Sequence, residues 1–150
     1  MTPELPDREV MTRRLRLLAD TLHDLSPLRG VPPDRLASEP ITRAAVERLI
    51  QVIVDLAVDV NAHLAVSVLG RAPSTGRESF LLAADAGVLE RPLAERLAPF
   101  AGMRNLLVHR YADIRLNLVA AAVDVVLDGF DIYVRAVASY LESMGDEKLR

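Results

Sequence analysis

The chain has 150 residues, of which 51% are hydrophobic and 26% charged, with a formal net charge of −3 and no cysteine. This composition indicates one globular domain and excludes disulfides, thiolate metal sites and cysteine nucleophiles. The slightly acidic balance argues against a protein that coats nucleic acid. No secretory signal is visible, and Asp55, Asp59, Asn61 and His63 interrupt the longest apolar segment, so we expect a cytoplasmic protein without a membrane span.

Helical periodicity begins near the N-terminus and is broken by proline and glycine. One apolar stripe runs at steps of four and three through Met11, Leu15, Leu18, Leu22 and Leu25. It predicts a helix over residues 7–25 with Asp7 as the N-cap. Residues 26–33 contain three prolines and a glycine and predict a break, followed by a short helix over 34–38.

A long second helix is predicted over residues 42–69, ended by Gly70. Its polar residues lie four apart and form what we call the polar row: Glu47, Gln51, Asp55, Asp59, His63 and Ser67. Almost all other positions are Ala, Val, Leu or Ile. A helix with so narrow a polar face is expected to be surrounded by neighbours on most sides.

The second half predicts further helices of unequal length. A loop over 71–76 precedes a short helix over 77–86 ended by Gly87, and another helix starts near Pro92 and runs towards residue 111. Pro99 and Gly102 lie inside that helix and predict a kink or a break. Asp113 should cap a last helix over 114–143, whose residues 124–142 carry a solvent-exposed polar face, before a frayed tail over 144–150. The expected fold is an all-α, up-and-down bundle of four long or medium helices plus short ones, in one domain over residues 1–150.

One segment, MRNLLVHRYADIR over residues 103–115, combines side chains that could cleave a phosphodiester bond without a metal. His109 can exchange a proton with a ribose 2′-hydroxyl or a leaving oxygen, because the pKa of histidine lies near neutrality. Arg104 can hold the phosphate, and Asn105 can donate a hydrogen bond to it. The use of a 2′-hydroxyl as nucleophile would make RNA the substrate.

The spacing of these residues constrains how a site could form. Arg104 and His109 are five residues apart, which is roughly 140° around an ideal helix, so they do not share a face. Asn105 and His109, four residues apart, do share one. Either the helix loosens near His109, or the site is assembled between two copies of the chain.

The sequence R-N-L-L-V-H-R-Y at residues 104–111 resembles the R-x-x-x-x-H-x-Y signature of HepT-type toxins in the HEPN superfamily. The resemblance extends over about residues 8–141 and includes the long helix with its polar row, PSTGRESF at 73–80, the segment 82–89 and the last helix. It implies a HEPN-like fold and a homodimeric ribonuclease toxin with catalytic Arg104 and His109. Asn105 fills the polar position after the arginine, and Asp59 lies where related proteins often have an acidic residue. The implied partner is a small nucleotidyltransferase antitoxin that attaches AMP to Tyr111.

Two other interpretations remain open from sequence. The chain could be a non-catalytic helical module that binds a nucleotidyltransferase, or a HEPN protein that binds a nucleotide or RNA without cutting it. The presence of both catalytic residue types and of the tyrosine favours the ribonuclease. We expect no metal and no cofactor, because the Glu-x-x-His pairs of di-metal bundles do not occur. His63 lies one turn after Asp59 and is interpreted as a core histidine held by that carboxylate.

Overall fold

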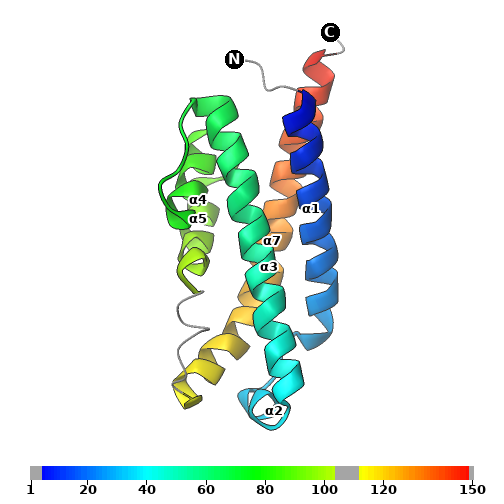
Figure 1. Cartoon of the computed structure of the whole chain (residues 1–150), viewed down its shortest axis with the longest axis vertical. Coiled ribbons are helices and arrows are strands. Elements are labelled where there is room, and N and C mark those ends of the chain that lie inside the picture. Colours follow the sequence, from blue (N-terminus) through cyan, green and yellow to red (C-terminus); the bar gives the residue numbers. More distant parts are fainter. Residues whose placement is uncertain (1–4, 104–111, 149–150) are drawn as a thin grey trace.

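The computed structural model describes residues 5–103 and 112–148, and within them it describes the side chains of residues 8–103 and 116–144. The elements are α1 (Leu5–Leu25), η1 (Ser26–Leu28), α2 (Pro33–Ser38), α3 (Pro40–Leu69), α4 (Gly76–Asp85), α5 (Arg91–Leu97), η2 (Ala98–Gly102) and α7 (Ala112–Lys148). The helix α1 runs down the molecule, α3 returns, α4, α5 and η2 descend together, and α7 returns again (Figure 1). No strand occurs in the described ranges, and the predicted all-α, up-and-down bundle is confirmed.

The central helix is α3, which contacts α1, α2, α4 and α7. Its buried side chains are Val46, Ile50, Ile53, Val54, Ala57, Val60, Asn61, Leu64 and Ala65. By length and composition alone, α3 could cross a membrane, since its most apolar window has a mean hydropathy of 1.8, and 39% of that window is buried. Its contacts with four other helices show that it packs within the bundle, although most of that window is not buried.

The glycines predicted to end helices do so. The backbone of Gly70 has φ 68° directly after α3, and that of Gly87 has φ 82° shortly after α4. Both values lie in the left-handed region, which glycine adopts without the steric cost of a Cβ. The predicted break near Pro99 is also present, because the α-helical conformation ends at Leu97 and η2 follows.

Several predicted boundaries are wrong by a few residues. Asp7 and Asp113 are not N-caps, because α1 already begins at Leu5 and α7 at Ala112. The helix α7 also continues to Lys148 beyond the predicted end at residue 143.

The face of α7 over residues 124–142 is not wholly free for solvent. The backbone N–H of Gly30 donates to Asp124 Oδ1 at 2.9 Å, and Arg29 Nη1 donates to Asp128 Oδ1 at 3.0 Å. Asp124 and Asp128, at the start of this face, therefore bind the segment that connects α1 to α2.

Candidate functional site

The motif residues Arg104, Asn105, His109 and Tyr111 lie outside the described residues. The structure does describe both flanks of the motif. Met103 follows η2 on one side, and Ala112 begins α7 on the other. The described part of the candidate site therefore consists of the elements on either side of residues 104–111.

Aromatic packing fixes the flank that precedes the motif. Phe100 in η2 lies edge-to-face against Phe130 of α7, with ring centroids 6.3 Å apart and an interplanar angle of 63°. Phe130 in turn contacts Phe80 of α4 at 6.1 Å and Tyr133 at 5.8 Å. Such edge-to-face pairs add to the stability that area burial provides. The segment leading into the motif is thus attached to the core of the bundle.

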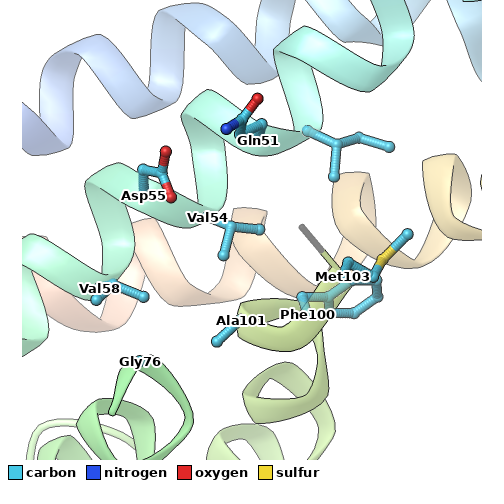
Figure 2. Close-up of a pocket in the computed structure, with 9 residues that line it drawn as sticks. Gln51, Val54, Asp55, Val58, Gly76, Phe100, Ala101 and Met103 are labelled. Atoms are coloured by element: carbon cyan, nitrogen blue, oxygen red, sulfur yellow. The ribbon is translucent and has the colours of Figure 1, made fainter. Parts of the chain in front are cut away.

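A cavity of about 140 Å³ lies between α3 and η2, directly beside Met103. Its lining residues are Ile50, Gln51, Val54, Asp55, Val58, Gly76, Phe100, Ala101 and Met103. In Figure 2, the α3 residues Val54 and Val58 lie across the cavity from Phe100, Ala101 and Met103, and Gln51 and Asp55 lie at its α3 edge. The walls are apolar, and the polar groups belong to the polar row.

The residues of the polar row have different surroundings at different positions along α3. Gln51 and Asp55 line the cavity beside Met103, whereas the Asp59 carboxylate forms an ion pair with Arg14 of α1. Asp59 Oδ2 also lies 3.8 Å from His63 Nε2. His63 is not the core histidine expected from sequence, because 32% of its side chain is exposed. A supporting role for Asp59 stays a prediction.

A chain of hydrogen bonds joins α7, α3 and α4 and reaches the cavity at Gly76. The Tyr133 hydroxyl lies 2.7 Å from Asn61 Oδ1 and 3.1 Å from the carbonyl oxygen of Ala57. Asn61 Nδ2 donates to Ser79 Oγ at 3.2 Å, and Ser79 Oγ donates to the carbonyl oxygen of Gly76, which lines the cavity. Burial, and to a lesser extent the charge of Asp59, raises the pKa of Tyr133 well above its ordinary value of 10.0. Tyr133 is therefore a neutral donor at physiological pH.

Sequence reasoning did not find this network or the cavity. Asn61 lies off the polar row, and Tyr133 falls on the apolar side of α7 between Phe130 and Val137. A polar residue at a core position is the one sequence signal that could have indicated a buried hydrogen bond, although it does not identify the partner. Among the residues that the structure describes, no group of three or more His, Asp or Glu side chains could hold a metal ion.

Comparison with solved structures defines the class of this fold. The chain resembles a tri-AMPylated Shewanella oneidensis HEPN toxin in complex with its MNT antitoxin, with a TM-score of 0.75 and 19% identity, covering 87% of this chain and 97% of that one. A mutant of the toxin-antitoxin MntA-HpeT gives a TM-score of 0.78 at 18% identity, covering 87% and 98%. The fold is therefore the all-helical HEPN fold.

Sequence comparison then gives the family. The family model described as Ribonuclease HepT-like matches residues 13–137. The chain is 32% identical over 138 residues to the tRNA nuclease HepT of Aphanizomenon flos-aquae, covering 92% of this chain and 94% of that relative. It is 26% identical over 91 residues to the mRNA nuclease HepT of Shewanella oneidensis, covering 61% and 65%. The chain belongs to the HepT-like family, which confirms the resemblance inferred from its motif.

Proposed function

We propose that this protein is a metal-independent endoribonuclease toxin, paired in the cytoplasm with a small nucleotidyltransferase antitoxin. The observation that carries the proposal is the family match over residues 13–137, a range that includes Arg104 and His109. Two relatives named as HepT nucleases, one of tRNA and one of mRNA, support an RNA substrate.

The proposed mechanism uses the ribose 2′-hydroxyl as the nucleophile. His109 exchanges the proton that leaves the 2′-hydroxyl or enters the departing 5′-oxygen, and Arg104 stabilises the charge that develops on the phosphate. Asn105 donates a further hydrogen bond to the same phosphate. The products are a 2′,3′-cyclic phosphate and a free 5′-hydroxyl, so the reaction balances without an added oxidant or metal.

We further propose that the active protein is a homodimer. Arg104 and His109 lie on different faces of an ideal helix, so a two-fold axis beside the motif would allow one copy to complete the site of the other. The incomplete burial of α3, with 39% of its most apolar window inside the bundle, supports a further covering surface. Light scattering at micromolar concentration should give twice the 16.5 kDa mass of one chain, and a monomer alone would contradict this step.

Tyr111 is proposed as the site at which the antitoxin acts. Attachment of AMP would add a negative charge and a nucleoside two residues from His109, which would repel and obstruct an incoming RNA phosphate. A related Shewanella toxin has been solved in a tri-AMPylated form with its MNT antitoxin, which supports a nucleotidyltransferase partner for this chain.

RNA cleavage by the purified, unmodified protein in the presence of EDTA tests the proposed function. His109→Ala should lower the rate by about a hundredfold or more, the usual scale for loss of a general acid or base. His23→Ala, at an exposed position of α1, is the matched control and should retain the full rate. Arg104→Lys should not restore what Arg104→Ala loses, because lysine lacks the bidentate guanidinium. A strict requirement for a divalent ion, or full activity of His109→Ala, would overturn the mechanism.

A further inference from the structure

We propose that the cavity between α3 and η2 binds one nucleobase of the RNA substrate and that it selects cytosine. This inference rests on the proposed ribonuclease function and adds the base specificity of the same site. The location supports it, because Met103 lines the cavity and the next residue in the chain is Arg104. A base held in this cavity would therefore lie next to the segment proposed to cleave the backbone.

The walls of the cavity suit the flat, apolar faces of a nucleobase. Val54 and Val58 of α3 lie on one side, and Phe100 and Met103 lie on the other, as Figure 2 shows. Unpaired RNA bases are commonly held by stacking on aromatic side chains, and the polarisable sulfur of methionine also packs favourably on rings. The walls therefore offer the contacts that a base removed from its stack requires.

Gly76, at the start of α4, lines the cavity and lies close to two other lining side chains. A Cβ at Gly76 would lie 3.1 Å from the Cβ of Ala101 and 3.3 Å from Cγ2 of Val58, so no larger residue fits there without a shift. Behind Gly76, its carbonyl oxygen accepts the hydrogen bond from Ser79. This part of the cavity wall is thus held in place by contacts within the fold.

The volume favours one ring over two. An engineered apolar cavity of about 150 Å³ in another protein binds benzene. The cavity beside Met103 measures about 140 Å³, which matches a single six-membered ring. The single ring of a pyrimidine, cytosine or uracil, fills this volume, whereas part of a two-ring purine would extend out of it.

The polar edge distinguishes between the two pyrimidines. The Asp55 carboxylate is exposed and accepts hydrogen bonds only, and none of the described residues donates to it. Gln51 Oε1 lies 3.5 Å from Arg48 Nη1, which leaves Nε2 as the donor of the Gln51 amide. Cytosine presents an amine donor beside two acceptors, N3 and O2, and so complements this pair of side chains. Uracil offers the carboxylate only its N3–H, which lies between the two acceptor oxygens O4 and O2, so it matches this pair of side chains less well.

Nucleotide binding to the full chain is the first test, and it does not depend on catalysis. Titration with CMP, UMP and AMP is followed by the NMR signals of the methyl groups of Val54, Val58 and Met103. CMP should shift these signals and bind about tenfold more tightly than UMP or AMP. Asp55→Asn should remove most of that preference, whereas Asp24→Asn, an exposed carboxylate of α1 that does not line the cavity, should retain it. Ala101→Leu, which fills the cavity, should abolish the shifts while circular dichroism confirms that the variant folds.

Cleavage of matched RNA oligonucleotides that differ by single C-to-U changes is the second test. Wild-type protein should cut beside cytosine, and Asp55→Asn should cut the two series at similar rates. Cleavage with no base preference, equal in wild type and Asp55→Asn, would overturn the pocket and leave the proposed function intact. If no RNA is cleaved, the proposed function fails and CMP binding alone decides the pocket. Methyl signals that no nucleotide shifts, or tighter binding of AMP than of CMP, would refute the inference.

Discussion

Replacing Tyr133 with phenylalanine removes one hydroxyl group from the middle of the bundle and leaves the ring packing in place. Tyr133 has no exposed surface, and its hydroxyl is the donor to Asn61 Oδ1 at 2.7 Å. Without it, Asn61 Oδ1 is a buried acceptor that has lost its donor, which costs about 1–3 kcal/mol. For a domain of this size, the melting temperature should fall by about 2–4 °C for each kcal/mol.

Urea and thermal unfolding monitored by circular dichroism measure this effect. Tyr140→Phe is the matched control on the same helix and should cost less, because Tyr140 is only half-buried and water can reach its surroundings. Asn61→Leu in the Tyr133→Phe background should cost less than the sum of the two single changes, since it removes the acceptor that the first change left unsatisfied. Strictly additive losses, or a Tyr133→Phe protein as stable as wild type, would refute the view that this bond stabilises the fold.

The same hydroxyl predicts how stability depends on alkaline pH. Burial raises the pKa of Tyr133 in the folded state well above 10.0, the value expected when the chain is unfolded. Between these two pKa values, the folded state keeps a proton that the unfolded state has released. The contribution of Tyr133 to the free energy of unfolding is therefore fully present below pH 10 and falls as the pH rises above 10. The slope should approach about 1.4 kcal/mol per pH unit, and Tyr133→Phe should reduce it by that amount.

Three further predictions concern packing, capping and regulation. Gly129→Ala should destabilise the protein by about 1–3 kcal/mol in urea unfolding, because a Cβ at this position would lie 2.8 Å from Leu97 Cδ2. Gly102→Ala is the control and should be nearly neutral, because no atom lies within 4 Å of a Cβ there. Thr75→Ala should cost about 1 kcal/mol by removing the side-chain cap of α4, and Thr75→Ser should keep it; equal losses in both would contradict that role. Co-expression with the partner nucleotidyltransferase should add AMP masses to the peptide containing Tyr111, and Tyr111→Phe should block them; addition at another tyrosine would show that the assignment is wrong.

The sequence predicted the helices well because spacing of apolar side chains determines which face is buried. It located their starts less well, for a consistent reason. Helices α1, α2 and α3 begin at or next to Pro6, Pro33 and Pro40, whereas the predicted starts were Asp7, Asp34 and Thr42. Proline lacks the N–H that the first turn of a helix leaves unpaired, so it fits there at no cost, and α1 therefore begins before Asp7, the predicted N-cap.

The site was predictable only as a set of residue types along one segment. Arginine, asparagine, histidine and tyrosine within residues 104–111 indicate phosphodiester chemistry from their functional groups alone. The cavity could not be predicted without the fold, because the fold brings Gln51 and Asp55 of α3 beside Phe100 of η2, which lies about a third of the chain length further along the sequence. The Tyr133 network also depends on tertiary proximity, since its three side chains come from three different helices.

The open cavity beside Phe100 implies a trade-off between the stability of the fold and the proposed selection of an RNA base. Filling this open space of about 140 Å³ with side-chain atoms would add packing contacts worth at most about 3 kcal/mol at 24 cal/mol per Å³, a large fraction of the stability of a small domain. Selection for heat resistance alone would therefore enlarge a lining residue such as Ala101 and close the space. With the proposed function and base selection, thermostable variants obtained in this way should lose discrimination between RNA sequences before they lose the ability to cut.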